Sequence, residues 1–302
     1  MKTLLTLLLW LCGLAAAAQV DTLRSKTAIE AYLKRQYRYK SVQLRAVNTV
    51  MKDTVAAEPA HPEYWLTADF NHDGQADLFV AASVAEGKQG ARDVFLILAS
   101  DHKRYTRVAI NSPVNYWIHG GRASWTSYSE AGRDYLAMAC LTTDFPRLKQ
   151  GGWASRIVYT TTHDTLFVLH GKPMIYTAHP TTQAVESIEF SVTPCFGTCP
   201  VFQLTIQNDG TAHYRGIAYV HKLGDFNLVM PKADLDYLVA LLANSKLPLL
   251  HDEYQVDYTD ASTVYLTVHY ADGQTKEITD YGLQGTYGLA TLYNFLLSQR
   301  DF

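Results

Sequence analysis

The sequence has few cysteines, no block of like charge and no long hydrophobic run beyond its first residues, and each shortage excludes something. Its 302 residues include 4 cysteines, 26 lysines and arginines, and 29 aspartates and glutamates, for a net charge of −3. Because like charges do not cluster, no nucleic-acid partner is expected. Because no later apolar run approaches about 20 residues, no membrane span is expected.

The signatures of several enzyme classes are also missing. The sequence has no His-Glu-x-x-His zinc motif, no Gly-x-Ser-x-Gly nucleophile turn, no Gly-x-x-x-x-Gly-Lys phosphate loop and no dinucleotide fingerprint. No internal repeat of solenoid or propeller period occurs. We therefore assign no catalytic residue from the sequence.

The first 18 residues have the pattern of a secretory signal peptide. Lys2 gives a positive start, an apolar run follows over residues 4–14, and Ala16-Ala17-Ala18 forms a small-residue cleavage site. The pattern predicts export to the periplasm or the extracellular space. Removal of this segment leaves Cys140, Cys195 and Cys199.

The chain from residue 19 to residue 180 is predicted to be a β-rich domain with one leading helix. Periodic apolar residues predict the helix over residues 21–38. Short apolar or alternating runs then predict strands, which we expect to form one twisted antiparallel sheet. These runs cover residues 64–68, 76–81, 93–99, 104–110, 135–141, 156–160 and 164–169.

Residues 185–302 are predicted to form a smaller α+β domain. Residues 171–186 carry turn-forming and polar residues without a period, which places the domain boundary there. Asp209-Gly210 and Asp272-Gly273 each separate two alternating segments, a pattern typical of tight hairpins. Helices are expected over about 231–244 and 289–299, so the fold class is α+β with two hairpins and two helices.

One loop of the first domain has the spacing of a cation site. Oxygen-bearing side chains stand at its positions one, three, five and nine, and a glycine stands at position six. Calcium prefers 6–8 oxygen ligands, and a tight loop with alternate side chains turned inward supplies most of them. The sequence therefore predicts a structural calcium ion. Its ligands would be Asp69, Asn71, Asp73, the backbone carbonyl of Gln75, and Asp77.

This loop resembles the Asp-x-Asn-x-Asp-Gly-x-x-Asp calcium loops between the strands of FG-GAP repeat proteins. It differs from an EF-hand because its twelfth position is Val80 and its flanks read as strands. The FG-GAP proteins carry many copies in a propeller, and this chain carries one. An Asp/Asn/Gly-rich hairpin without a metal ion is the alternative.

Cys195 and Cys199 form a close pair around Gly197, which favours a disulfide in an exported protein. A redox-active pair is less favoured, because Pro200 and a strand pattern follow where a helix N-terminus would lower a thiolate pKa. A metal site or two free thiols are the remaining alternatives. Cys140 lies in an apolar run and is expected to be a buried side chain.

The segment around this pair resembles a bacterial family catalogued as domain of unknown function 6438. The resemblance rests on the core Pro194-Cys195-Phe196-Gly197-Thr198-Cys199-Pro200, on Asp209-Gly210, Tyr214, Gly216 and Gly224, and on Tyr254, Thr259-Asp260 and Tyr281-Gly282. It covers about residues 185–300. It implies an exported domain, common in bacteroidete-type bacteria, and it transfers no catalytic residue.

The sequence therefore favours a non-enzymatic binding or structural module of the cell envelope, with an envelope protein or a glycan as partner. The alternative is a hydrolase or a thiol-dependent enzyme. It would use the acidic patch near Asp257 and Asp260, or the Cys195/Cys199 pair.

Overall fold

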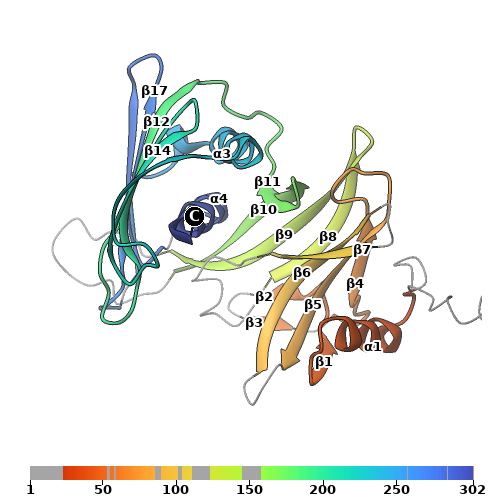
Figure 1. Ribbon diagram of the computed structural model, residues 1–302. Helices are drawn as coiled ribbons and strands as arrows, with labels where there is room; N and C mark the ends of the chain where they lie inside the picture. Colours follow the sequence, from red (N-terminus) through yellow and green to blue (C-terminus); the bar gives the residue numbers. More distant parts are fainter. Residues whose placement is uncertain are drawn as a thin grey trace, which may run out of the picture.

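The computed structural model describes residues 23–52, 55–57, 59–85, 90–100, 104–110, 123–144, 158–256, 258–283 and 285–301. The signal peptide predicted over residues 1–18 lies outside these ranges. Within them the protein is rich in β-strands and has few helices (Figure 1). In the same ranges no helix combines the length and the apolar character that crossing a membrane requires.

The N-terminal part begins with helix α1 (Lys26–Gln36), which packs on a five-stranded antiparallel sheet. The order of the sheet is β1-β5-β6-β7, and β4 also pairs with β5. The strands are β1 (Ser41–Leu44), β4 (Trp65–Ala68), β5 (Asp77–Ala85), β6 (Gly90–Ser100) and β7 (Arg104–Ala109). The helix buries Ile29, Tyr32 and Leu33 against this sheet, as its apolar periodicity predicts.

A second, four-stranded sheet packs on the other face of the first. Its order is β11-β10-β9-β8, and a separate two-stranded ribbon pairs β2 with β3. These strands are β8 (Ala123–Glu130), β9 (Arg133–Asp144), β10 (Val158–Leu169), β11 (Lys172–Ile175), β2 (Val50–Lys52) and β3 (Val55–Ala57). The prediction of a single sheet was wrong. Residues 78–82 of β5 are all buried, so this strand is apolar on both faces and needs a cover on each.

The segment predicted to be an aperiodic connection, residues 171–186, contains strand β11. Leu169 pairs with Lys172 across a turn in which His170 and Gly171 both have positive φ, so β10 and β11 form a hairpin. A four-residue strand is too short for its alternation to be recognised in the sequence. Strand β12 then begins at Val185.

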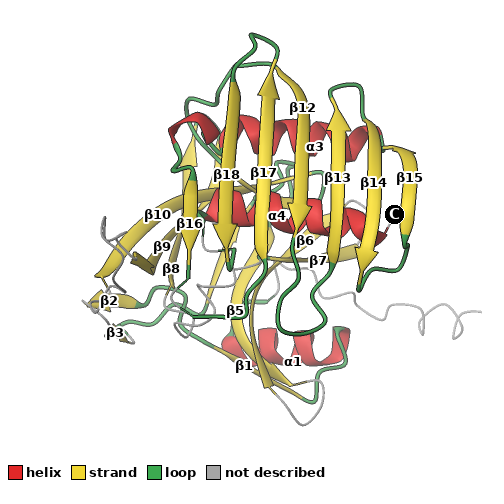
Figure 2. Ribbon diagram, turned by 90° about the vertical axis from the view of Figure 1, so that its left-hand side faces the viewer, coloured by secondary structure: helices red, strands yellow, loops and turns green. Residues whose placement is uncertain are grey.

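The C-terminal part is a seven-stranded sheet in the order β15-β14-β13-β12-β17-β18-β16 (Figure 2). All neighbours are antiparallel except β16 and β18. The strands are β12 (Val185–Val192), β13 (Val201–Gln207), β14 (Thr211–Ala218), β15 (Gly224–Val229), β16 (Glu253–Gln255), β17 (Thr263–Tyr270) and β18 (Thr275–Tyr281). The predicted turns at Asp209-Gly210 and Asp272-Gly273 join β13 to β14 and β17 to β18.

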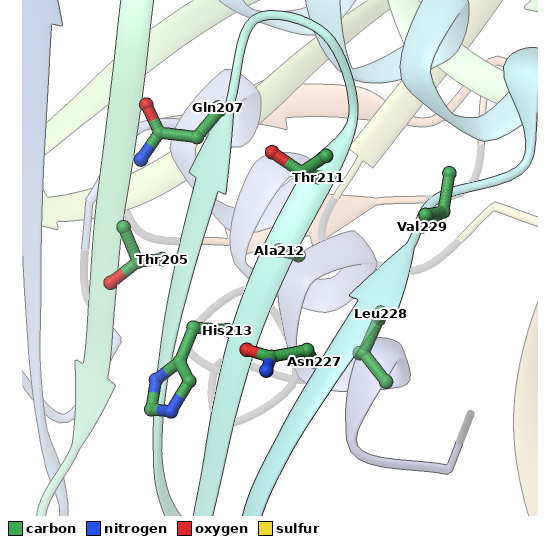
Figure 3. A pocket seen from close by; sticks show the side chains of 8 residues that line it. All are labelled: Thr205, Gln207, Thr211, Ala212, His213, Asn227, Leu228 and Val229. Carbon is green, nitrogen blue, oxygen red and sulfur yellow. The ribbon is translucent and has the colours of Figure 1, made fainter.

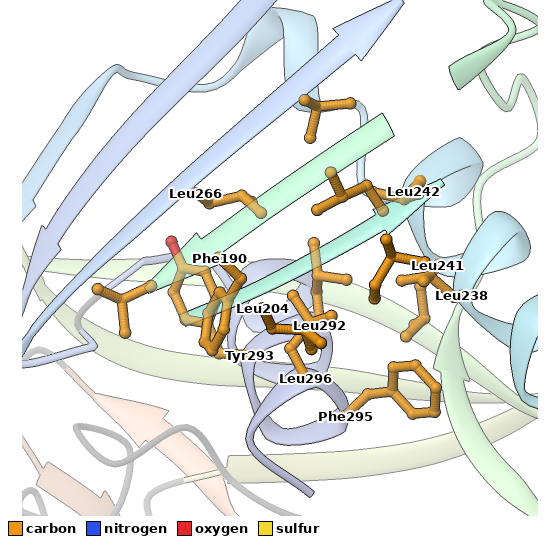
Figure 4. Packing of buried hydrophobic residues seen from close by; sticks show 14 of the residues in the cluster. Phe190, Leu204, Leu238, Leu241, Leu242, Leu266, Leu292, Tyr293, Phe295 and Leu296 are labelled. Atoms are coloured by element: carbon orange, nitrogen blue, oxygen red, sulfur yellow. The ribbon is translucent and has the colours of Figure 1, made fainter. Parts of the chain in front are cut away.

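Two helices cover one face of this sheet. They are α3 (Lys232–Asn244) and α4 (Tyr287–Ser298), and short 3-10 turns occur at η2 (Leu247–Leu249) and η3 (Gln299–Asp301). The core between sheet and helices is apolar and includes Phe190, Leu204, Leu241, Leu292 and Leu296 (Figure 4). The opposite face is not covered by any of the described helices (Figure 2).

At their junction, each part buries a side chain in the core of the other. Met174 of β11 belongs to the buried cluster of the seven-stranded sheet and its helices. Tyr287, at the start of α4, belongs to the buried cluster between the two N-terminal sheets. In Figure 1, α4 lies between the seven-stranded sheet and the strands β9 to β11. The cores therefore meet along α4.

Candidate functional site

The loop predicted to bind a cation connects β4 to β5. Ala68, the last residue of β4, pairs with Asp77, the first residue of β5, so the loop is the closed end of a hairpin. Gly74 has a φ of 86°, in the left-handed region that favours glycine. The strand-loop-strand context expected from the sequence is present.

Two of the predicted ligands fold the loop around their own carboxylates. Asp69 accepts hydrogen bonds from the backbone N–H groups of Asp73 (3.0 Å) and Gly74 (2.8 Å). Asp73 accepts from the N–H of Gln75 (2.9 Å) and from the side-chain amide of Asn71 (3.1 Å). A carboxylate offers about four lone-pair sites. Each of these two carboxylates therefore retains acceptor capacity for a cation.

Asp77 is fully buried and connects the loop to a neighbouring strand. Its Oδ2 accepts from the N–H groups of Phe70 (2.9 Å) and Asn71 (3.3 Å). Its Oδ1 accepts from the N–H of Ala99 in β6 (2.8 Å). Burial raises the pKa of this carboxyl to about 7, and the three hydrogen bonds only partly oppose the shift. The Asp77 side chain therefore holds the start of the loop to β5 and β6 by hydrogen bonds.

The loop also joins the two N-terminal sheets. The N–H of Asp69 donates to the carboxylate of Asp134 in β9 (2.9 Å). The Nε2 of His72 lies 3.0 Å from the carbonyl oxygen of Asp134, and its ring stacks on Phe167 of β10 at 6.0 Å. The carbonyl of Phe70 accepts from the N–H of Val168, also in β10 (3.0 Å). An ion bound in this loop would therefore affect the contact between the two sheets.

The ligand set itself stays a prediction. Among the described residues, no three side chains of His, Cys, Asp or Glu converge as a ready metal site. The predicted set contains three such side chains, those of Asp69, Asp73 and Asp77, so this finding does not support the calcium prediction; the other predicted ligands are the Asn71 amide and the backbone carbonyl of Gln75. Of these two residues, Gln75 contributes its N–H to Asp73, and Asn71 accepts from the N–H of Asp73 (3.1 Å).

The cysteine pair lies in the loop that connects β12 to β13. Cys195 and Cys199 form a disulfide, with 5.7 Å between their Cα atoms, within the usual range for such bonds. Between them, the side chain of Phe196 is 88% exposed. The N–H of Phe196 donates to the carbonyl of Asp260 (3.1 Å), so the loop is held against the segment before β17.

Cys140, in β9, is buried, as expected. Burial raises the pKa of its thiol well above the ordinary value, and the charge of Asp164 adds to this shift. A thiol that does not ionise is a poor nucleophile and a poor metal ligand. The sequence expectation of a small buried side chain is therefore confirmed.

The acidic patch proposed from the sequence is not one cluster of free carboxylates. Asp252 pairs with Lys276 at 2.6 Å, which holds the pKa of that carboxyl below its usual value. Asp257 lies outside the described residues. Asp260 has a positive φ of 73°, and its side chain accepts from the Thr259 hydroxyl at 3.2 Å.

Sequence reasoning missed a fully buried carboxylate close to this region. Asp280 is 0% exposed, and it accepts from the N–H of Gly285 at 2.8 Å. Its charge raises the pKa of Tyr254, behind the larger effect of burial. Alternation along β18 indicates an inward position for residue 280. Alternation is a weak indication of burial when the residue is an aspartate, because charged side chains are rarely buried.

The uncovered face of the seven-stranded sheet carries a shallow hollow of about 430 Å³ over β13, β14 and β15 (Figure 3). Its rim is formed by polar hydrogen-bonding side chains and one valine. These are Thr205, Gln207, Thr211, His213, Asn227 and Val229, with Ala212 and Leu228 also lining it. On the same strands, His213 lies 3.5 Å from Asp225. The hollow therefore offers hydrogen-bond donors and acceptors beside one exposed apolar side chain.

The fold and these sites define a β-rich protein in which a helix-backed sheet carries a disulfide-closed hairpin. Residues 186–300 match the family model described as a domain of unknown function (DUF6438). The match confirms the resemblance drawn from the cysteine core. No curated protein and no solved structure matches the chain.

Proposed function

We propose that the protein is a non-enzymatic binding or structural module, exported to the cell envelope, in which one calcium ion stabilises the loop of residues 69–77. The observation that carries the calcium proposal is the arrangement of this loop. Asp69 and Asp73 bend it around their carboxylates, and Asp77 fixes its end to β6. Export is supported by the signal-peptide pattern and agrees with a disulfide.

Calcium should act on stability, because the loop contacts both N-terminal sheets. An ion that binds only the folded state stabilises it by mass action. We expect chelation to lower the melting temperature, and we expect Asp73→Ala to abolish the response to calcium. The measurement is thermal unfolding with excess chelator and with millimolar calcium.

Asp209→Ala is the matched control. Asp209 lies in another Asp-Gly hairpin turn and accepts from Thr211, at 2.8 Å from its N–H and 2.7 Å from its hydroxyl. This variant should keep the full calcium response. If the wild-type melting curve is the same with chelator and with calcium, the loop is a metal-free hairpin.

We further propose that the chain consists of the two predicted domains, residues 19–180 and 185–302, and that the uncovered sheet face of the second domain binds an envelope protein or glycan. Its hollow and its polar rim support this assignment. Titration of the protein with soluble cell-wall glycan fragments, followed by amide chemical shifts, tests it. Shifts confined to β13, β14 and β15 are expected, and an unperturbed face contradicts the glycan assignment.

The enzyme alternative requires a reacting group. Cys195 and Cys199 are bonded to each other, so neither offers a thiolate until the bond is reduced. Of the two proposed carboxylates, Asp260 is described and Asp257 is not. No described contact favours this alternative over the binding module.

A further inference from the structure

Strand β15 forms one edge of the seven-stranded sheet, and its outer side is open in Figure 2. It pairs with β14 from Thr211↔Val229 to Gly216↔Gly224. Among the described residues no strand pairs with its other side. An edge strand presents a row of unpaired N–H and C=O groups that can bind a further strand.

This edge lacks the usual protection against pairing. Natural edge strands are short or carry charges, especially lysine, or proline. The six residues of β15 include one charged side chain, Asp225, and no lysine, arginine or proline. The opposite edge strand, β16, has only three residues.

Exposed apolar side chains gather beside β15. The hairpin from β14 to β15 holds four of them, with exposed fractions of 49%, 61%, 63% and 75% for Ile217, Tyr219, Leu223 and Val229. On the inner face, Phe226 and Leu228 are only partly buried against the core. The apolar core therefore continues to the edge, where the Lys222 ammonium lies 5.9 Å from the centroid of the Phe226 ring.

We propose that β15 pairs antiparallel with β15 of a second copy of this chain, about a twofold axis at Phe226. The two sheets then continue as one, with the helices of both copies on the same side. Directly opposite residues in such a pair point to the same face. Asp225 meets Asn227 of the second copy, and Val229 lies beside Leu223 of the second copy, which comes just before the first residue of β15.

The single charge of the strand selects this register. In an antiparallel pair the residue numbers of two opposite residues add up to the same sum along the whole strand. Opposite side chains must point to the same face, so another register changes this sum by two. One step in one direction places Asp225 opposite Asp225 of the second copy, where like charges repel. One step in the other direction places Asp225 opposite Val229. In the proposed register each Asp225 carboxylate can instead accept from an Asn227 amide.

The occupant is a second copy because the strand is complementary to itself. The two Asp225–Asn227 pairs lie on either side of the axis, and Phe226 meets its own copy on the core side. The exposed Val229 extends over the segment just before β15 of the second copy. The pairing covers five residues of each strand, 224–228, and so short a contact buries less surface than the roughly 1,200–2,000 Å² of stable complexes. We therefore expect a weak dimer, which forms independently of the cation loop.

Cysteine cross-linking tests the register. Directly opposite residues have Cα atoms about 4.5–5.5 Å apart, within reach of a disulfide. Under mild oxidation a mixture of Asp225→Cys and Asn227→Cys chains should form the mixed dimer. Each variant alone should form much less. Self-linking of Asn227→Cys alone, or no linking in the mixture, overturns the proposal.

Sedimentation of the purified full chain tests the association itself. We expect the monomer–dimer equilibrium to shift toward monomer by at least tenfold in Val229→Lys. Val239→Lys is the matched control, because Val239 is 53% exposed on α3, away from this edge. A wild-type chain that stays monomeric up to about millimolar concentration, or an equal shift in both variants, also overturns the proposal. Chelator should change neither result, which separates this test from that of the calcium loop.

Discussion

Buried carboxylates anchor loops in both parts of this protein. Asp77 and Asp280 are each 0% exposed, and each accepts hydrogen bonds from backbone N–H groups. A buried charge without such partners would cost several kcal/mol. Asp77 fixes the loop of residues 69–77, and Asp280 fixes the turn before α4. Both buried carboxylates therefore have a structural role.

Asp164 makes stability depend on pH. Burial raises the pKa of this carboxyl to about 6 from its ordinary value of 3.8, against a smaller opposing effect of His163. The folded state therefore holds a proton that the unfolded chain has lost between about pH 4 and pH 6. This contribution is fully present below pH 4 and is lost as the pH rises through 6. We expect Asp164→Asn to be more stable than the wild type at pH 7.5, by on the order of 1–3 kcal/mol.

The measurement is the free energy of unfolding in urea at several pH values. The difference between Asp164→Asn and the wild type should grow from pH 4 to pH 7 and then level off. The other titrating groups affect both proteins alike, so their contribution cancels in the difference between the variant and the wild type. Parallel curves for the two proteins would show that Asp164 titrates alike in the folded and unfolded chains.

At the scale of elements, the disulfide-closed hairpin between β12 and β13 is a small constraint on a well-packed sheet. Closing a loop of about five residues is expected to stabilise the fold by only about 2 kcal/mol. The Cys195→Ser, Cys199→Ser double variant should therefore fold and lose about this amount. Urea unfolding measures it.

Thiol titration of the unfolded exported chain provides the companion measurement. We expect one reactive thiol, that of Cys140, when the chain is purified from an oxidising compartment. Three reactive thiols would mean that the Cys195–Cys199 bond does not form there. A stability loss much above 4 kcal/mol would instead show that the hairpin holds more of the sheet than its contacts indicate.

At the scale of the whole molecule, β11 couples the two predicted domains. Met174 is buried in the C-terminal core, and Lys172 forms an ion pair with Asp234 of α3. The hydroxyl of Tyr237 donates to the carbonyl of Pro173. These contacts cross the boundary that the sequence predicts.

We therefore expect the fragment of residues 185–302 to be less stable than the fragment of residues 171–302. The missing Met174 side chain alone should cost about 2–5 kcal/mol, as the loss of a buried methionine does elsewhere. Met174→Ala in the longer fragment is the matched variant, and it should show much of this loss. Equal urea midpoints for the two fragments would mean that residues 171–184 belong to the N-terminal part alone.

The sequence by itself determined the local features whose signals are local. The hairpin turns at Asp209-Gly210 and Asp272-Gly273 need glycine at a positive φ, and the apolar faces of α1, α3 and α4 repeat with the helical period. The spacing of Cys195 and Cys199 around Gly197 indicated the disulfide. The residues around that pair also indicated the resemblance that the match of residues 186–300 to a family model confirms.

Only the tertiary structure decided the features that depend on distant neighbours. The split of the N-terminal strands into two sheets rests on β5 being covered on both faces, which a run of apolar residues alone does not specify. The burial of Asp280, the insertion of Met174 into the other core and the open edge at β15 likewise depend on which strands lie side by side. Burial and edge position are properties of the assembled sheet, because they are set by residues far apart in the chain.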